Sequence, residues 1–252
     1  MQTFGIIGKS LSHSFSQQFF TKKFQEKNID DAEYQLFSLS NIDEMTDLLK
    51  HPTLLGFNVT SPYKIEIIPF LDKLDIVAQE VGAVNCVVKE NKKWVGYNTD
   101  VFGFEQLLQK LEVQNSKNAY GLTLLLSYAL ILGSGGAAKA VCYVLKKRNI
   151  PFQIVSRNKT DNTISYNELT ELIINHYTLI INTTPLGMLP HANEMPPLLY
   201  PALNHNHILI DLIYNPEETL FLKEGKKRSA FTMNGLAMFE AQAEASYLLF
   251  NS

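Results

Sequence analysis

Cysteine is scarce in this sequence: 252 residues contain two, Cys86 and Cys142. Two cysteines cannot build the disulfide framework of a secreted domain, and both lie in apolar surroundings, so we expect reduced thiols in a core. The stretch from Met1 to Gly8 lacks the basic start and the long apolar centre of a secretory signal peptide. These absences predict a cytoplasmic protein.

An excess of charge of either sign is also absent. The 22 basic and 25 acidic residues give a formal net charge of -3. The one basic cluster, Lys223 to Arg228, is short and typical of a solvated helix end, unlike the basic surface of a nucleic-acid-binding protein. The most apolar stretch, Leu122 to Leu132, is too short to span a bilayer, which requires about 20 residues. We therefore expect no nucleic-acid partner and no membrane partner, and we predict no metal site.

A glycine cluster is the most informative feature that the sequence does contain. An apolar run, Ala129 to Leu132, leads into Gly133-Ser134-Gly135-Gly136-Ala137-Ala138 and then into a helix-like segment. The run is typical of a buried parallel strand, with a tight turn at Gly133 and close backbone approach to a pyrophosphate at Gly135. The small Ala138 allows close packing of the helix, whose first N–H groups favour phosphate. The stretch therefore predicts a dinucleotide site.

The apolar segments alternate in the order expected of an α/β protein. In the first half we expect strands at 3–7, 34–39 and 54–59, helices at 16–28, at 41–49 and from Pro62, a hairpin at 83–89 and 94–98, and a helix at 100–111. In the second half we expect strands at 127–132, 152–155, 178–182, 208–212 and 231–233, with helices between them and a last helix at 236–250. The role of the apolar stretch 120–126 stays open.

The predicted fold class is α/β, with two α/β domains. We expect a mainly parallel sheet in the first domain and a dinucleotide-binding sheet in the second, with the boundary near residues 102–104 on the predicted helix 100–111.

Polar residues follow the predicted strands at the points where open α/β sheets bind their ligands. Ser14 and Ser16 stand at a helix start, where hydroxyl and N–H groups can grip a carboxylate, although Ser14 also suits an ordinary N-cap. Lys64 lies on the first turn of the helix predicted from Pro62, where the dipole disfavours a cation, so either a function or a solvated side chain explains it. Asp100 suits an N-cap or, within reach of Lys64, an acid–base pair.

The segment that follows the predicted strand 152–155 indicates which cofactor is bound. An NAD site usually has an acid there to hold the ribose hydroxyls, whereas this segment contains Arg157 and Lys159 and no acid. Arg157 suits a 2′-phosphate because a guanidinium group is planar and bidentate. We therefore predict NADP (NADPH) rather than NAD. Another polar stretch, Asn182 to Met188, follows a further apolar strand and is expected to face a cofactor or a substrate.

Taken together, these stretches resemble the shikimate dehydrogenase family from Gly8 to the last helix. The resemblance rests on the order and spacing of Ser12-His13-Ser14-Phe15-Ser16, Asn58-Val59-Thr60-Ser61-Pro62-Tyr63-Lys64, Gly82-Ala83-Val84-Asn85, Asn98-Thr99-Asp100, the glycine loop, Asn182-Thr183-Thr184-Pro185-Leu186-Gly187-Met188, Asp211 with Tyr214, Asn234-Gly235 with Met238, and Gln242-Ala243-Glu244. It implies NADP-dependent interconversion of 3-dehydroshikimate and shikimate, and a last helix that returns to the first domain. Residues 1–103 plus 235–252 would then form a substrate-binding and catalytic domain, and residues 104–234 an NADP-binding, Rossmann-like domain.

The resemblance also implies roles for single residues. Lys64 and Asp100 would be the catalytic pair. The substrate would be bound by Ser14, Ser16, Thr60, Asn85, Tyr214 and Gln242. Together with the two basic residues from the charge argument, the expected cofactor-binding residues are Gly133, Gly135, Gly136, Ala137, Arg157, Lys159, Thr183, Met188, Gly235 and Met238.

The sequence departs from the family pattern at three positions. Gln17 stands where the family usually has Pro, Cys86 where it often has Thr, and Asp161 where a second basic residue often follows the arginine. Two alternatives stay open: an NAD-dependent quinate/shikimate dehydrogenase, against which Arg157 argues, and a non-catalytic dinucleotide-binding sensor, which should have lost the catalytic pair. The expected partner is a small-molecule substrate, and the chain would be a monomer or a homodimer.

Overall fold

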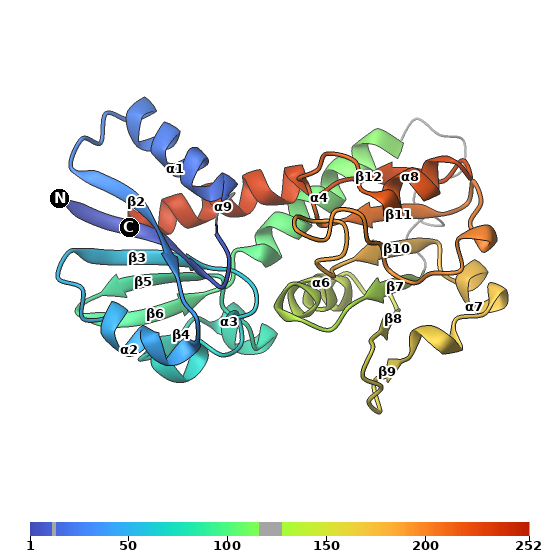
Figure 1. Ribbon diagram of the computed structural model, residues 1–252, viewed down its shortest axis with the longest axis horizontal. Helices are drawn as coiled ribbons and strands as arrows, with labels where there is room; N and C mark the ends of the chain where they lie inside the picture. Colours follow the sequence, from blue (N-terminus) through green and yellow to red (C-terminus); the bar gives the residue numbers. More distant parts are fainter. Residues whose placement is uncertain (12–13, 116–127, 252) are drawn as a thin grey trace. The chain divides into compact units, whose positions relative to one another are not determined.

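The computed structural model describes residues 1–11, 14–115 and 128–251 (Figure 1). The chain forms two compact units, the first comprising Met1–Phe102 with Glu240–Ser252 and the second comprising Gly103–Phe239. It leaves the first unit within α4 (Asp100–Asn115) and returns within α9 (Leu236–Phe250). The apolar stretch 120–126 lies outside the described residues. Among the helices that are described, none is both long and apolar enough to cross a bilayer.

The first unit contains a six-stranded mixed sheet in the order β2-β1-β3-β5-β6-β4. Its strands are β1 (Gln2–Gly8), β2 (Ala32–Ser38), β3 (Leu54–Val59), β4 (Lys73–Leu74), β5 (Cys86–Glu90) and β6 (Lys93–Tyr97). β1 pairs in parallel with β2 and β3, whereas β5 is antiparallel to β3 and β6. The β5–β6 turn consists of Asn91 (φ 48°) and Lys92 (φ 67°), both left-handed, as a two-residue turn between twisted strands requires. This hairpin brings residues 83–85 and 98–100 to the same end of the sheet.

Neighbouring residues of β3 face opposite sides of this sheet. The helices of the unit are α1 (Phe15–Glu26), α2 (Met45–Leu48) and α3 (Ile76–Val81), with the adjoining parts of α4 and α9. A Cβ atom on Gly56 would lie 2.8 Å from the ring of Phe250 in α9, and that ring lies 5.4 Å from Phe20 of α1, measured between centroids. The next residue, Phe57, belongs to a buried cluster with Met45 of α2. Phe20 and Phe24 of α1 are therefore part of the core of this unit.

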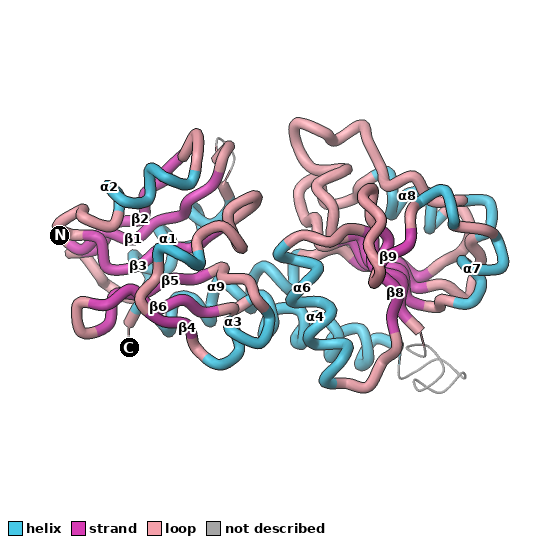
Figure 2. Tube along the Cα trace, turned by 90° about the horizontal axis from the view of Figure 1, so that it is seen from below, coloured by secondary structure: helices cyan, strands magenta, loops and turns pink. Residues whose placement is uncertain are grey.

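The second unit contains a six-stranded parallel sheet in the order β12-β11-β10-β7-β8-β9. Its strands are β7 (Ala129–Leu132), β8 (Phe152–Val155), β9 (Thr163–Ile164), β10 (Leu179–Asn182), β11 (Ile208–Asp211) and β12 (Phe231–Met233), and its helices include α6 (Gly136–Lys147), α7 (Glu171–His176) and α8 (Leu220–Lys226). Helices lie on both faces (Figure 2). Because helices cover both faces, every residue of β7, β10 and β11 is buried, and these strands are apolar except for their last residues Asn182 and Asp211. The predicted α/β fold class with two sheets is confirmed.

The helix predicted from Pro62 is wrong. Residues 61–67 form a series of turns ahead of a short 3₁₀ segment, Ile68–Phe70. An α-helix would pair the carbonyl oxygen of Lys64 with the N–H of residue 68, but this oxygen accepts a 2.7 Å hydrogen bond from the N–H of Val84. The dipole argument for Lys64 therefore does not apply, and a bond to a distant segment fixes its loop instead.

The helix predicted at 41–49 is shorter than expected. The predicted capping box is present, since Glu44 Oε1 accepts the N–H of Asn41 at 3.2 Å and Asn41 Oδ1 accepts the N–H of Asp43 at 2.9 Å. The box closes a 3₁₀ segment, Ile42–Glu44, and α2 adds a single turn after it.

Candidate active site

The carboxyl ends of β1 and β3 lie side by side at one edge of the first sheet. The two strands pair Ile7 with Val59. The next residue, Thr60, donates its N–H to the carbonyl of Ile7 at 3.0 Å, and its Cγ2 would lie 2.6 Å from a Cβ atom on Gly8. The loop toward Ser14 and the loop that carries Lys64 therefore begin at neighbouring strand ends, where open α/β sheets bind ligands.

Lys64 and Asp100 form a direct ion pair in the first unit. Lys64 Nζ lies 2.5 Å from Asp100 Oδ2, and the two side chains are only 16% and 7% exposed. Water therefore screens the attraction less than at a surface pair. Asp100 begins α4, but its carboxylate is directed to the lysine, while Asn98 Oδ1 accepts the first free N–H, that of Val101, at 3.2 Å. Asp100 was expected either to cap the helix or to pair with Lys64. The structure shows the ion pair, and Asn98 caps the helix instead.

Asn85 holds the other oxygen of the carboxylate. Its Nδ2 donates to Asp100 Oδ1 at 2.8 Å and to Thr99 Oγ1 at 2.9 Å, and its Oδ1 accepts the N–H of Thr99 at 2.6 Å. Gln242 on α9 lies beside this group, with Oε1 3.4 Å from Asn85 Nδ2. The structure thus brings Lys64, Asp100, Asn85 and Gln242 together, and it uses the amide of Asn85 to orient Asp100.

The two serines of the first loop lie at the start of α1. Ser14 is the N-cap residue in extended conformation (ψ 112°), yet its side chain makes no capping hydrogen bond. Ser16 is buried in the first turn. Tyr214, another residue expected to bind the substrate, belongs to the second unit, where its ring stacks on Phe239 at 4.5 Å between centroids. Burial raises the pKa of the Tyr214 phenol, so this hydroxyl stays protonated and can donate a hydrogen bond.

The predicted glycine loop opens α6. Gly133 has a φ of 110°, where a side chain is strained, and a Cβ atom there would lie 2.7 Å from Thr183 Oγ1. Gly135 is the N-cap residue and makes no side-chain cap, and a Cβ atom on it would meet nothing within 4 Å. Gly136 and Ala137 form the start of the helix, whose first turn contains no acidic residue. The first N–H groups of α6 have no side-chain cap, and together with the positive end of the helix dipole they suit a phosphate group.

Two basic side chains follow β8, and they differ in their surroundings. Lys159 Nζ pairs with Glu168 Oε1 at 2.6 Å, and this contact, with those from Ser165, lowers the pKa of Glu168 to about 2. Arg157 is exposed, and within the described part of the chain no carboxylate pairs with it. It lies near Tyr166. Burial raises the pKa of the Tyr166 phenol to about 12, and the positive charge of Arg157 opposes this rise. Arg157 is therefore free to bind an anion, whereas Lys159 is already neutralised.

A buried polar cluster joins the loops after β10 and β11. Asn182 Nδ2 donates to Asp211 Oδ1 at 3.0 Å, and both residues have no exposed surface. Asp211 also accepts the N–H of Ile213 at 3.1 Å and the hydroxyl of Thr219 at 2.6 Å. Burial raises the pKa of Asp211 to about 7, and these hydrogen bonds oppose the shift. The sequence identified Asp211 only as part of the family motif, and no local sequence pattern predicted that Thr219 would contact it.

The remaining cofactor candidates lie around these loops. The hydroxyl of Thr183 donates to the carbonyl of Leu132 at 2.8 Å and so ties the loop after β10 to the end of β7. Met188 is exposed and Met238 is buried. A Cβ atom on Gly235 would lie 2.1 Å from the carbonyl oxygen of Leu212, so only glycine fits there.

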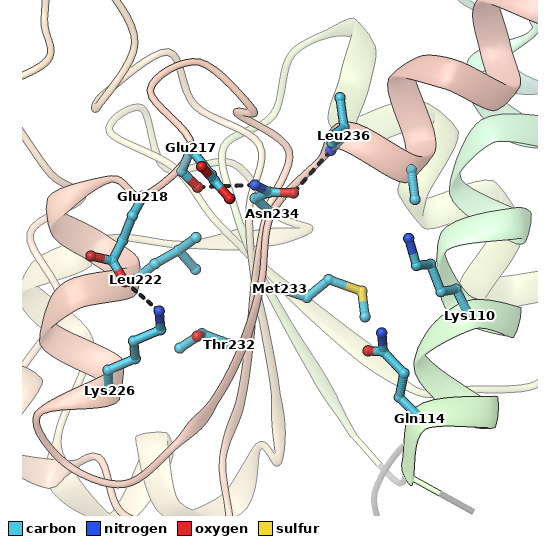
Figure 3. Close-up of a pocket in the computed structure, with 11 residues that line it drawn as sticks. Lys110, Gln114, Glu217, Glu218, Leu222, Lys226, Thr232, Met233, Asn234 and Leu236 are labelled. Atoms are coloured by element: carbon cyan, nitrogen blue, oxygen red, sulfur yellow. Dashed lines mark hydrogen bonds and ion pairs between the residues drawn. The ribbon is translucent and has the colours of Figure 1, made fainter.

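A separate pocket of about 540 Å³ lies within the second unit, between α4, α8 and β12 (Figure 3). Two lysines and two glutamates balance the charge of its lining, and one of each, Lys226 and Glu218, pair with each other. Asn234 Nδ2 donates to the carbonyl oxygen of Glu217 at 2.9 Å on the same wall. The lining of the pocket contains none of the predicted site residues.

A parallel sheet with an uncapped glycine loop, together with a shielded lysine–carboxylate pair, defines the class of this protein as a nucleotide-dependent α/β oxidoreductase. A family model, the shikimate dehydrogenase substrate binding domain, matches residues 6–87. The shikimate dehydrogenase (NADP(+)) of Methanococcus aeolicus is 35% identical to this chain in an alignment that covers 96% of this chain and 89% of that protein.

Solved structures agree with this similarity. The crystal structure of shikimate dehydrogenase 1 from Peptoclostridium difficile has a TM-score of 0.84 at 33% identity and covers 100% of this chain and 92% of that chain. Shikimate 5-dehydrogenase from Thermus thermophilus, in complex with NADP(H) and shikimate, has a TM-score of 0.83 at 25% identity, with coverage of 99% and 93%. The chain belongs to the shikimate dehydrogenase family.

Proposed function

We propose that this protein catalyses the reversible NADP-dependent reduction of 3-dehydroshikimate to shikimate. The observation that carries the proposal is the 2.5 Å contact between Lys64 Nζ and Asp100 Oδ2 at the carboxyl edge of the first sheet. Relatives that share most of the chain are named for this activity. In this proposal, residues 1–103 with 235–252 bind the substrate and carry out proton transfer, and residues 104–234 bind NADP.

The chain's own residues supply the acid–base chemistry. NADPH, when bound, would supply the hydride for the carbonyl carbon, so the chain's own residues must provide a proton for the carbonyl oxygen. Lys64 donates that proton from Nζ during reduction, and in the reverse direction it takes the proton from the substrate hydroxyl. Asp100 accepts a hydrogen bond from Nζ and so directs it, while Asn85 keeps the carboxylate in place. Because the pair is shielded from water, the positive charge of Lys64 stabilises a developing alkoxide more strongly than it would at a surface.

Substrate recognition uses groups that the fold leaves at the same edge. We assign the substrate carboxylate to Ser14 and Ser16. The Ser14 hydroxyl makes no capping bond, which supports this role. Tyr214, which belongs to the second unit, keeps its assignment to substrate binding on the family resemblance alone. We assign the ring hydroxyls and the carbonyl to Thr60, Asn85, Asp100 and Gln242, of which the last three already form one hydrogen-bonded group.

The second unit fits a dinucleotide. Its pyrophosphate would lie on Gly133, Gly135, Gly136 and Ala137, where a missing Cβ leaves space at Gly135. The 2′-phosphate of NADP would pair with Arg157, with Lys159 as a weaker contact because Glu168 already holds it. Thr183, Met188, Gly235 and Met238 would lie along the nicotinamide half.

The test is the absorbance of reduced nicotinamide during oxidation of shikimate and of quinate, each with NADP+ and with NAD+. We expect the highest kcat/KM for shikimate with NADP+. A preference for quinate and NAD+ would support the NAD-dependent quinate/shikimate dehydrogenase instead. Binding of the dinucleotide without turnover of either substrate would support the non-catalytic sensor.

A further inference from the structure

Ser246 lies at the centre of a buried polar chain in the first unit. It is on α9 and has no exposed surface. Its Oγ lies 2.9 Å from Asn58 Nδ2 at the end of β3 and 3.0 Å from Thr99 Oγ1 just before α4. It also lies 2.9 Å from the carbonyl oxygen of Gln242, one turn earlier on α9. One hydroxyl group thus connects segments that lie far apart in the sequence.

Counting hydrogens gives these bonds a direction. A serine hydroxyl has one proton, and the carbonyl of Gln242 can only accept it, so Ser246 Oγ accepts from Asn58 and from the hydroxyl of Thr99. Thr99 Oγ1 in turn accepts from Asn85 Nδ2 at 2.9 Å, and the second hydrogen of this Nδ2 goes to Asp100 Oδ1 at 2.8 Å. An unbroken series of hydrogen bonds therefore runs from α9 through Thr99 and Asn85 to Asp100.

The other end of the series is anchored in the sheet. Asn58 Oδ1 accepts the hydroxyl of Tyr34 at 2.8 Å, and its Nδ2 also donates to the carbonyl of Asn85 at 3.2 Å. Within the described residues, every buried side-chain nitrogen and oxygen atom has a partner. A network that is fully satisfied has one arrangement, and the loss of one member leaves others to find new partners.

We infer that Ser246 is a positioning residue for the Lys64–Asp100 pair, acting through Thr99 and Asn85. The inference rests on the proposed function, because it requires that the pair transfers the proton. Without the Ser246 hydroxyl, the Thr99 hydroxyl turns to its nearest alternatives, Asn85 Oδ1 at 3.2 Å and Gln242 Oε1 at 3.4 Å. The first choice changes the hydrogen bonds of Asn85, which holds Asp100, and the second changes those of Gln242, which lies 3.4 Å from Asn85 Nδ2.

The first measurement is kcat and KM of Ser246→Ala in shikimate oxidation with NADP+. We expect kcat to fall about 10-fold, as for a small misplacement of a reacting group, while KM for NADP+ stays unchanged. The matched control is Thr3→Val, which removes another buried hydroxyl of the first unit, bonded to Thr53 at 2.8 Å and outside the series. We expect the control to lower the Tm and leave kcat within about twofold. Equal kcat values in the two variants would overturn the inference.

The second measurement is coupling. In an Asp100→Asn background, Ser246→Ala should change kcat by less than about twofold, because the carboxylate that it positions is gone. A further full 10-fold loss in that background would contradict the inference. If Ser246→Ala does not fold, Thr99→Val breaks the series from the other side, and Thr99→Ser should restore most of the kcat that Thr99→Val loses.

A Lys64→Ala variant distinguishes failure of the proposed function from failure of the role of Ser246. If it keeps near-full kcat, the proposed role of the pair fails and this inference fails with it. If Lys64→Ala loses turnover while Ser246→Ala keeps it, the proposed function stands and the role of Ser246 is refuted.

Discussion

Asn85 Nδ2 lies 2.8 Å from Asp100 Oδ1, the carboxylate oxygen that Lys64 does not contact. The two oxygens of Asp100 are therefore held by different groups, one by a neutral amide and one by an ammonium. Asn85 is itself held by the N–H and the hydroxyl of Thr99. A carboxylate bound in this way has little freedom to turn, so the direction of Lys64 Nζ is set before a substrate arrives.

Replacing Lys64 removes the proposed proton donor. We expect Lys64→Ala to lower kcat by roughly 10²–10⁴, with a smaller change in KM for shikimate, because the lost interaction acts mainly in the transition state. Steady-state kinetics in both directions measure this. Lys22→Ala is the control, since Lys22 is 77% exposed in a surface pair with Glu26. A Lys64→Ala variant with near-full kcat would remove this residue from the mechanism.

The serines at the start of α1 are expected to act on binding. Loss of both hydroxyls in Ser14→Ala/Ser16→Ala should raise KM for shikimate by about 10-fold or more, because hydrogen bonds to a charged group contribute about 1.5–3 kcal/mol each. KM for NADP+ should not change. Ser10→Ala serves as the matched control, because Ser10 is an exposed serine in the same loop. An unchanged KM for shikimate in the double variant would mean that the substrate carboxylate is held elsewhere.

The preference for NADP is expected to depend on Arg157. Arg157→Ala should raise KM for NADPH by about 10-fold or more through loss of a bidentate phosphate contact, and leave KM for NADH unchanged. Lys159→Ala should have the smaller effect, since Lys159 is paired with Glu168 at 2.6 Å. Kinetics with both reduced cofactors measure this. Equal use of NADH by the unmodified protein would refute the assignment.

The sequence predicted those parts of the fold that local signals decide. The strands Phe152–Val155 and Phe231–Met233 and the helix Leu236–Phe250 have the predicted bounds, because apolar periodicity and flanking turn residues specify them. The glycine loop could also be predicted from the local sequence, because the turn at Gly133 has a positive φ that favours glycine. The two-residue strands β4 and β9 were not predicted. They are too short to show a pattern of their own, and only their pairing with β6 and β8 defines them as strands.

Errors arose where distant segments decide the local structure. The loop of Lys64 shows the pattern of a helix start, yet the bond from Val84 prevents a helix there. Asn98 and Asp100 both suit an N-cap by residue type, and the choice depends on Lys64, which lies 36 residues from Asp100. The same limit applies to Ser246, whose partner Asn58 is 188 residues away. No local pattern distinguishes this serine from one on a solvated face.

Both cysteines are expected to be unreactive in the folded protein. Burial raises the pKa of Cys86 and that of Cys142 to about 12, so almost no thiolate, the reactive form, is present at pH 8. A chromogenic disulfide reagent should therefore release little colour from the native protein and should titrate two thiols after unfolding. Rapid modification of either thiol in the native state would contradict the burial that the structure shows.

The carboxyl group of Asp211 is expected to make stability depend on pH. Burial raises its pKa from an ordinary 3.8 to about 7, so between these values the folded state binds a proton that the unfolded state releases. This contribution to stability is complete below about pH 4 and is lost as the pH rises through about 7. Above that pH, the folded protein holds a buried charge that three hydrogen bonds only partly offset.

The variant Asp211→Asn isolates this effect. An asparagine can keep Oδ1 as the acceptor for Asn182 and Ile213 and turn its amide toward Thr219 Oγ1, but it does not titrate. We expect Asp211→Asn to gain Tm relative to the unmodified protein as the pH is raised from 5 to 8, because only the unmodified protein acquires the buried charge over that range. Calorimetry at the two pH values measures the difference. The control is Asp161→Asn, which removes an exposed carboxylate from the same unit. A Tm difference for Asp211→Asn that is the same at pH 5 and at pH 8 would show that Asp211 does not titrate in this range.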